Sequence, residues 1–485
     1  MDPLPACCRR NPQSAEILNG IVEGVYDPET TIVRDKRVKV SSADKNQGQP
    51  TDMTKNNELP KAKIPRLVSL DTFRGIIMCT LAANGFAFAE TAKKLGYLDV
   101  EPESWAARIW QWLAFHASHT FWNSQCYVIG CSYWDLIQPA FMLMVGVAIP
   151  YSFASRRTRG DSTVQIYLHA AWRALVLVLL GIVIQCGNQG LEYYNVLGNV
   201  LAQIGLGYFI ACLLIGIRAR YQIGIGVCIL VGYWVFMVSL PIHETTAEQI
   251  VSQEVDTSEL VHPQWYSPEN VDARIRKSKD ELLSVSMNVA RQFTRHTNVP
   301  ESMDRWLLNQ IPRKNRFLLN PEGFATLNFI PSLVTMVMGL IAGQLLRSSS
   351  TEKQKVAYLM AGGAICMTIA MIAGFTVCPM IKRIWTPSWT LYSGAWVLWM
   401  LAALYWVIDI RGIKFWTWPL VVVGTNSLAI YLMHFLLFRW TADRIQVYFG
   451  EFSGSYSPTI EACAVFSVFW LVCLYLYSNK LFLRV

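Results

Sequence analysis

The sequence predicts an all-α polytopic membrane protein with about ten transmembrane helices and one long extracytoplasmic loop. Hydrophobic residues make up 53% of the 485 residues and charged residues only 16%, whereas a soluble chain carries roughly 25% charged residues. The apolar residues also gather into long runs, such as those that begin at Ala174 and Val356. Since a helix of about 20 apolar residues crosses a bilayer core, each long run predicts one span.

The predicted spans fall into two groups of five. The first group lies within residues 66–240 and the second within 324–485. In chain order, the spans are expected at 67–90, 133–154, 170–187, 199–217, 222–240, 324–346, 356–378, 388–409, 416–438 and 459–482. No short-period repeat is present, which excludes solenoid and propeller architectures.

Two polar segments lie outside the predicted spans. Residues 1–65 mix charges without apolar period and hold no signal-peptide core, so we expect a disordered cytoplasmic tail. Residues 241–323 form the one long interspan segment. They are rich in charge and predict an extracytoplasmic insert that carries a short helix from Ser278.

The orientation follows from the short connections. The stretches SRRTRGD, IRARYQ, RSSSTEKQK and DIRGIK are basic and fall on one side of the predicted topology, which is the cytoplasmic side by the positive-inside rule. Both termini are then cytoplasmic, and the loop 91–132 faces outward. The outer loop PMIKRIWTPS carries Lys382 and Arg383 against the rule, and we interpret these two as noise.

Charge and cysteine usage exclude other classes. The net charge of +8 is explained by basic cytoplasmic loops, so no nucleic-acid partner is expected. The twelve cysteines form no CxxC pair and no metal-ligand spacing with histidine. Cys126 and Cys131 could form a disulfide if their loop faces an oxidising compartment, and the sequence leaves this open.

The outer loop brings two histidines to the edge of a predicted span. His116 and His119 lie in the stretch FHASHTFWN, and histidine can both take and give a proton near neutral pH. A metal site would need further ligands, and no motif organises the nearby Glu101 and Glu103, so no metal is predicted. A single catalytic histidine is favoured over a pair, and a structural histidine among aromatic residues remains the alternative.

Other polar residues lie within or beside predicted spans. Asp135 is either an acid favoured by a helix dipole or a buried acceptor that fixes the tautomer of a histidine. Asp71 and Arg74, spaced i, i+3, can neutralise each other on one helix face, either as a functional pair or as a pair at the membrane surface.

Three further residues carry an amide or an imidazole inside predicted spans. Asn84 lies near the outer end of the first span. It either joins helices or caps one, or its amide orients a catalytic histidine or polarises a carbonyl. Asn426 and His434, eight residues apart, are expected roughly on one face of a single helix, where helix–helix hydrogen bonding is the common explanation and function the alternative.

Taken in order, several stretches resemble one family. They are RLVSLDTFRG, Asn84, HTFWN before YWDLIQPAFMLMVGVA, NVLAQIGLGYF, NPEGFATLNFIPSLVTMVMGLIAG and GTNSLAIYLMH. From about Arg66 to Tyr477 the chain resembles the heparan-alpha-glucosaminide N-acetyltransferase family of transmembrane acetyltransferases, as a bacterial-type relative. The family pattern HxxWN matches His119, Trp122 and Asn123, although the stretch from this motif to Asp135 looks longer than in the lysosomal enzyme.

The resemblance implies an enzyme that moves an acetyl group from cytoplasmic acetyl-CoA, its co-substrate, to an amine or hydroxyl of a glucosamine-like sugar on the outer face. His119 would be the general base, or the nucleophile that carries the acetyl group, and Asn84 would bind the thioester carbonyl or hold His119. Asp135 would support the catalytic centre. The residues expected to bind acetyl-CoA are Asp71, Arg74, Asn426 and His434 along the pantetheine channel, and Arg156, Arg157, Arg159, Arg218 and Arg220 at the phosphates.

The same resemblance implies an integral protein of a bacterial inner membrane, with a carbohydrate acceptor, the lipid bilayer as surroundings and compatibility with a homodimer. The alternative function is a transporter for a sugar or a lipid-linked saccharide, against which we find no inverted repeat and no paired broken helices. A third possibility is an inactive scaffold that binds no CoA.

Overall fold

The protein is described by a computed structural model. It describes residues 67–98, 104–120, 131–189, 197–240, 292–293, 298–310, 317, 320, 323–449 and 454–483. Within these residues the chain is helical and has no strand, which confirms the predicted all-α class. The helices, in chain order, are α2 (Val68–Ala82), η1 (Asn84–Ala87), α3 (Phe88–Lys94), α4 (Trp105–His116), α6 (Tyr133–Arg159), α7 (Thr163–Gln189), α8 (Val200–Leu213), α9 (Ala219–Ser239), α13 (Val299–Leu308), η4 (Thr326–Asn328), α14 (Phe329–Arg347), α15 (Glu352–Thr376), α16 (Pro387–Leu404), the π-helical turn η5 (Tyr405–Ile410), α17 (Trp418–Thr425), α18 (Ser427–Phe449) and α19 (Ser457–Ser478).

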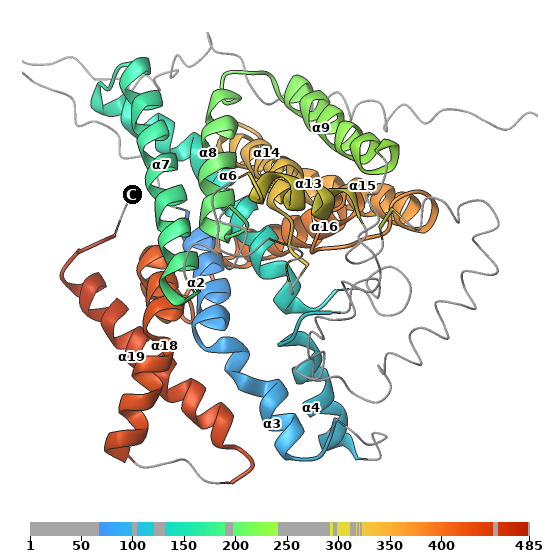
Figure 1. Ribbon diagram of the computed structural model, residues 1–485. Coiled ribbons are helices and arrows are strands. Elements are labelled where there is room, and N and C mark those ends of the chain that lie inside the picture. The colour runs from blue at the N-terminus through green and yellow to red at the C-terminus, as the bar shows by residue number, and fades with distance from the viewer. Residues whose placement is uncertain are drawn as a thin grey trace, which may run out of the picture.

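Helices α6 and α14 form the centre of the bundle (Figure 1). They approach closely because glycines face the partner backbone: a Cβ added to Gly146 would lie 2.0 Å from the Met336 carbonyl oxygen, and one on Gly339 would lie 2.1 Å from that of Leu143. Small residues allow such tight packing between membrane helices. The apolar window of α14 is 78% buried and that of α15 only 17%, so α14 is central and α15 peripheral.

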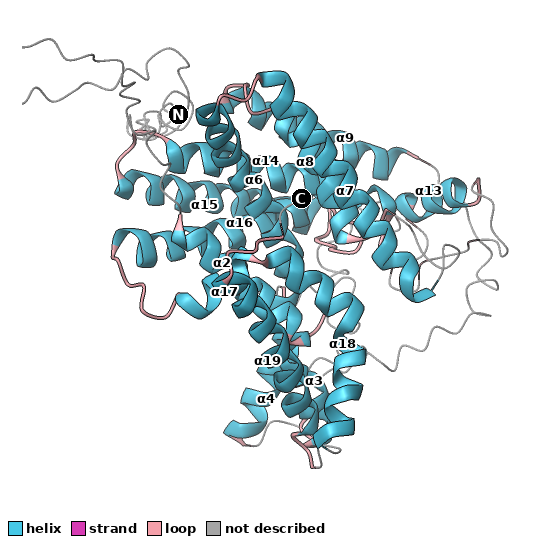
Figure 2. Cartoon of the chain, turned by 90° about the vertical axis from the view of Figure 1, so that its left-hand side faces the viewer, coloured by secondary structure: helices cyan, strands magenta, loops and turns pink. Residues whose placement is uncertain are grey.

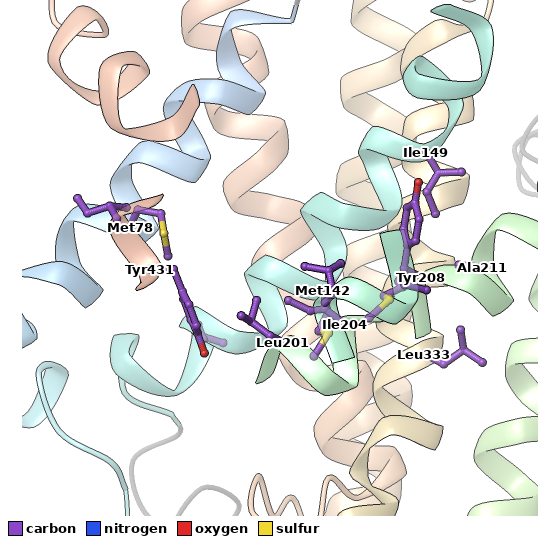
Figure 3. Packing of buried hydrophobic residues seen from close by; sticks show 14 of the residues in the cluster. Met78, Met142, Ile149, Leu201, Ile204, Tyr208, Ala211, Leu333 and Tyr431 are labelled. Carbon is purple, nitrogen blue, oxygen red and sulfur yellow. The ribbon is translucent and has the colours of Figure 1, made fainter. Parts of the chain in front are cut away.

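Apolar side chains fill the space between α6 and its neighbours. Met142 of α6 packs in one buried cluster with Ile204 and Tyr208 of α8, as Figure 3 shows. Tyr431 of α18 lies in the same cluster beside Met78 of α2. These contacts join the two ends of the chain around α6.

The described residues contain seven helices that are long and apolar enough to cross a membrane, or up to nine if each of two bent pairs is one span. Together with the short apolar helix Val200–Leu213, these helices overlap the ten predicted segments, and some extend beyond them. The integral membrane character is therefore supported, whereas the exact number of crossings stays a prediction.

Two pairs of apolar helices in the described part of the chain are bent sharply at a break. Val68–Ala82 and Asn84–Lys94 meet at 50°, and Trp418–Thr425 and Ser427–Phe449 meet at 75°. The expectation that the chain has no paired broken helices was therefore wrong, and so was the placement of Asn426 and His434 on one helix, because α17 ends before Asn426. The first break is a left-handed turn in which Asn84, Gly85, Phe86 and Ala87 all have positive φ. Such backbone is costly outside glycine and asparagine and gathers at functional sites.

The helices α3, α4, α18 and α19 extend together beyond the broad part of the bundle (Figure 2). Polar contacts hold them: Thr91 and Thr459 hydroxyls lie 2.8 Å apart, and Lys94 Nζ donates to Ser457 Oγ at 2.8 Å. The expected helix from Ser278 lies outside the described residues. Near it, the insert forms α13, which begins after the N-cap Asn298.

Candidate active site

The first turn of α6 holds a buried carboxylate. Ser132 is the N-cap of α6 and accepts a hydrogen bond from the Asp135 backbone N–H at 3.2 Å. Ser132 Oγ in turn donates to Asp135 Oδ2 at 3.0 Å. An acidic residue is favoured in the first turn because the N-terminal N–H groups and the helix dipole stabilise negative charge. Here the side chain is also only 1% exposed.

His119 approaches this carboxylate from the other side. Helix α4 ends at His116, and the chain then turns so that His119 Nδ1 lies 2.8 Å from Asp135 Oδ1. The next residue, Thr120, donates its backbone N–H (3.2 Å) and its hydroxyl (2.7 Å) to Asp135 Oδ2. This geometry corresponds to the interpretation of Asp135 as a buried acceptor for a histidine of the preceding loop. The place of Asp135 in the first turn of α6 also fits the other interpretation, an acid favoured by the helix dipole.

A lysine completes the cluster. Lys382 Nζ donates to Asp135 Oδ1 at 3.1 Å and lies 3.3 Å from His119 Nδ1. Lys382 is buried, with 6% of its surface exposed. Sequence reasoning missed Lys382, and the interpretation of Lys382 as topological noise does not fit its place in the cluster. The signal was present, because a basic residue in a short outer loop breaks the positive-inside rule.

The turn that presents Lys382 is held by several elements. The Thr386 hydroxyl accepts from the Ile381 N–H at 3.0 Å, and the Trp385 N–H donates to the Lys382 carbonyl at 2.9 Å. Asn328 Nδ2 donates to the carbonyl of Arg383 at 2.8 Å. The guanidinium of Arg383 lies over the Phe324 ring, which itself packs 6.3 Å from the His119 ring. Lys382 is therefore fixed in position.

The network assigns the tautomer of His119. Asp135 is an acceptor, so Nδ1 must carry the proton that points to Oδ1, and Nε2 is left with its lone pair. Burial, and next to it the charge of Lys382, lower the pKa of His119 to about 4, while Asp135 opposes the shift. The side chain keeps 33% of its surface accessible. The arrangement can therefore accept a proton at Nε2 from a bound group.

His116 has a different environment. Its Nδ1 accepts a hydrogen bond from the Tyr133 backbone N–H at 3.1 Å, and its ring packs against Trp112 and Phe115. Burial lowers its pKa. The ring thus helps to tie the end of α4 to the start of α6.

Asn84 lies close to the cluster and does not bond to it. It is exposed at the break after α2, and no hydrogen bond joins it to His119 among the residues described. Its neighbour Gly85 has φ +61°, and a Cβ there would lie 3.1 Å from Ala117 Cβ and 3.3 Å from the Trp134 ring. The break therefore packs against the chain that carries His119.

A second polar region follows α2 toward its other end. Arg74 and Asp71 form the predicted i, i+3 ion pair, with Nη1 3.5 Å from Oδ1. Helix α17 lies against this point, since a Cβ on Gly424 would be 1.9 Å from the Asp71 carbonyl oxygen. Two residues later, Asn426 is fully buried.

We define the α2–α18 interface as the surface where Asn426, Tyr431 and His434 lie along α2. His434 contacts the backbone of Ala82, and Tyr431 packs near Met78 (Figure 3). Asn426 Oδ1, the Tyr431 hydroxyl and His434 Nδ1 are all buried without a hydrogen-bond partner in the described part of the chain. An unpartnered buried polar atom costs about 1–3 kcal/mol, so three in a row point to a polar ligand or water.

The predicted phosphate-binding arginines lie at other helix ends. Arg156 forms an ion pair with Asp161 at 3.0 Å. The other four of these arginines are exposed: Arg157, Arg159, Arg218 and Arg220. Cys131 has a free thiol, and Cys126, Trp122 and Asn123 lie outside the described residues. Where the structure describes side chains, no group of three or more His, Cys, Asp or Glu residues could hold a metal ion.

Two curated proteins are similar to this chain. Both are named heparan-alpha-glucosaminide N-acetyltransferase. The human protein is 24% identical over 462 residues, which cover 87% of this chain and 60% of the human protein. The mouse protein is 22% identical over 513 residues, with 97% and 68% covered. The chain thus spans about three fifths of the human relative. No protein-family model matches. These similarities support a distant relationship to that family.

Proposed function

We propose that the protein is a membrane acetyltransferase that uses acetyl-CoA from the cytoplasm and acetylates an amine or hydroxyl of a glucosamine-like sugar on the outer face. The observation that carries the proposal is the hydrogen-bonded cluster of His119, Asp135 and Lys382, which leaves His119 Nε2 free to act as a base. The similarity to proteins named N-acetyltransferases supports the reaction class.

His119 begins the reaction by taking the proton of the acceptor at Nε2. The acceptor nitrogen or oxygen bonds to the acetyl carbonyl carbon, and the bond between that carbon and the CoA sulfur then breaks. Asp135 stabilises the imidazolium while the proton is held, and His119 returns the proton to the leaving thiolate. The Asn84 amide donates to the carbonyl oxygen as negative charge develops on it. Attack by His119 itself, with an acetyl-imidazole intermediate, is the other route.

The α2–α18 interface is proposed to take the pantetheine arm of CoA. It runs beside α2 from Asp71 to Asn84, which is about 20 Å of helix, and ends beside the chain that carries His119. Its unpartnered atoms on Asn426, Tyr431 and His434 can pair with amide groups. The Asp71–Arg74 pair marks the cytoplasmic end, where the arginines of the basic loops would bind the CoA phosphates.

The proposed surroundings follow from the topology. We propose that both termini are cytoplasmic, that residues 91–132 and 241–323 are external, and that the membrane is a bacterial inner membrane. A carbohydrate acceptor would then meet His119 from outside, and a homodimer is compatible with this arrangement.

The assignment is tested with purified protein in lipid nanodiscs. Labelled acetyl-CoA and glucosamine should yield labelled N-acetyl product, and His119→Ala should abolish the transfer while keeping the thermal unfolding temperature. His116→Ala is the matched control. This variant should retain activity, because the His116 ring accepts a hydrogen bond only from the Tyr133 backbone N–H among the described residues. Full activity of His119→Ala would refute the role of His119.

A second function is favoured by one observation. Two broken helices that pack against each other are typical of secondary transporters, where substrate binds at the breaks. If the protein is a sugar transporter, liposomes that contain it should take up labelled sugar without acetyl-CoA. Uptake that needs acetyl-CoA and releases acetylated sugar supports the enzyme instead, and binding of neither CoA nor sugar would indicate a scaffold.

A further inference from the structure

The cluster holds one buried carboxylate and two groups that can carry positive charge. Asp135 is 1% exposed and Lys382 6% exposed. Both Lys382 Nζ and His119 Nδ1 approach the same oxygen, Asp135 Oδ1, at 3.1 and 2.8 Å. A buried carboxylate needs a counter-charge because the cost of removing an ion from water is several kcal/mol.

The ordinary basicities decide which group supplies that charge. An unperturbed lysine has a pKa of 10.5 and an unperturbed histidine 6.5. Burial lowers the pKa of Lys382, and Asp135 opposes the shift. The contact of Lys382 Nζ with Asp135 Oδ1 at 3.1 Å favours the ammonium form of the lysine. With Asp135 at −1 and Lys382 at +1, a second cation at His119 would leave an excess buried charge.

Among the described residues, the other charged or titratable groups near His119 either add to this balance or leave it unchanged. Arg383, from the same loop as Lys382, adds positive charge that disfavours an imidazolium. Cys131, beside Asp135 and Lys382, stays neutral because burial raises its pKa to about 12. The rings of Trp134 and Phe324, which pack against His119, carry no charge.

We propose that Lys382 is a positioning residue that supplies the counter-charge of Asp135 and thereby keeps His119 neutral and able to accept a proton. The proposal rests on the proposed function for its catalytic meaning. Without Lys382, His119 becomes the counter-ion of Asp135. It then carries a proton at Nε2 in the resting state and cannot act as a base.

One consequence concerns acid conditions. A histidine with a pKa of about 4 remains a free base at pH 5, where an ordinary histidine is almost wholly protonated. Burial and the charge of Lys382 together therefore extend the working range of the base into acid.

The test measures the protonation of His119 directly and uses no acetyl-CoA. Diethyl pyrocarbonate modifies neutral imidazole, and mass spectrometry of the His119 peptide gives its modification rate between pH 5 and 8. The full-length wild-type protein should show a rate limited by this residue's exposure and independent of pH. In Lys382→Met the modification rate should decrease as the pH is lowered, and the midpoint of this decrease should lie above the ordinary histidine pKa of 6.5.

Further variants separate charge from packing. Lys382→Arg keeps the cation and should keep the wild-type profile. Lys382→Met combined with Asp135→Asn removes both charges and should return the midpoint of the His119 modification profile below 6.5. If Lys382 has only a structural role, the double variant should instead disturb the profile more than Lys382→Met alone. Lys355→Met, at the cytoplasmic end near the Leu346 carbonyl, is the matched control and should change nothing.

The outcomes are distinct from those of the acetyl-transfer assay. A wild-type profile in Lys382→Met, or a double variant that stays at the raised midpoint, would overturn the role of Lys382. If Lys382→Met does not fold, the double variant against Lys382→Arg gives the same decision. A protein that transfers no acetyl group would refute the proposed function and leave the His119 titration measurable.

Discussion

The two ends of the proposed reaction path differ in how their polar groups are satisfied. Around His119, Asp135 accepts from Lys382, Ser132 and Thr120 as well as from the imidazole. Along the α2–α18 interface, buried polar atoms of Asn426, Tyr431 and His434 have no partner among the described residues. The Asp135 carboxylate is held by four groups, whereas these three atoms at the α2–α18 interface have no partner within the described chain.

This difference assigns a different task to each region. Catalytic groups need fixed orientation before substrate arrives, because preorganised dipoles lose no free energy to reorganisation during reaction. A ligand-binding wall must keep hydrogen-bonding capacity for the ligand, at a cost in the free protein. The predictions below test this division, from the largest expected effect to the smallest.

The largest effect is expected for Asp135→Asn. The amide cannot hold Nδ1–H in the same way, and losing the carboxylate of a His–Asp pair lowers turnover about 10⁴-fold. The unfolding free energy should also fall by about 3–5 kcal/mol, because Lys382 would remain as an unpaired buried charge. Acetyl transfer and urea unfolding measure the two effects.

The control for this variant is Asp161→Asn. Asp161 also pairs with a cation, Arg156, but its side chain is 31% exposed, so the stability change should stay below about 1 kcal/mol. Equal losses in both variants would mean that the buried network has no special role.

The pH profile of kcat/KM is the next test. Protonation of His119 removes the base, and its pKa is lowered to about 4. The rate should therefore be constant from neutral pH to about 5 and fall roughly tenfold per unit below 4. A half-maximal point near 6.5 would show that the histidine is not held neutral by its surroundings.

A smaller effect is expected at the α2–α18 interface. Tyr431→Phe removes a hydroxyl that is buried without a partner, so the free protein should be as stable as wild type or more stable. If the hydroxyl binds the pantetheine arm, CoA affinity should fall about 5–10-fold. Calorimetric titration of CoA and a thermal melt without CoA give both values.

Thr335→Val is the matched variant for that test. Thr335 Oγ1 is likewise buried without a partner, but it lies on α14, away from the interface. It should raise stability similarly and leave CoA affinity unchanged. If the two variants affect CoA equally, the interface is not where CoA binds.

The smallest effect is expected for Arg74→Met. The Arg74–Asp71 pair is partly exposed and 3.5 Å long, so its loss should cost at most about 1 kcal/mol. The KM for acetyl-CoA should rise about 2–5-fold with kcat unchanged. Arg444→Met, an exposed arginine in the last turns of α18, is the control. A changed kcat would place Arg74 in the chemistry instead.

Short-range features were predictable from the sequence. The Asp71–Arg74 contact follows from helix geometry alone, and His119 with Asp135 could be paired because a short loop joins them. The outcome at Lys382 shows the limit, since it is 247 residues from Asp135. No local pattern reports a contact between the loop that joins α15 to α16 and the first turn of α6. The exception of Lys382 to the positive-inside rule was the available signal.

The helix breaks were hidden for a different reason. Hydropathy averages over a window, so a span that bends at Asn84 or at Asn426 has the same profile as a straight one. The stretch GTNS at the second break holds residues that favour turns, and this local chemistry was overridden in the prediction by the apolar residues on both sides.

The most direct test of the account is vectorial transfer in sealed proteoliposomes. Acetyl-CoA labelled in the acetyl group is added on one side and glucosamine is enclosed on the other, with His119→Ala as the inactive control. For protein oriented with its basic loops toward acetyl-CoA, we expect labelled N-acetylglucosamine to appear only inside the vesicles. Product formed only where both substrates share one side, or equal product from His119→Ala, would contradict the account.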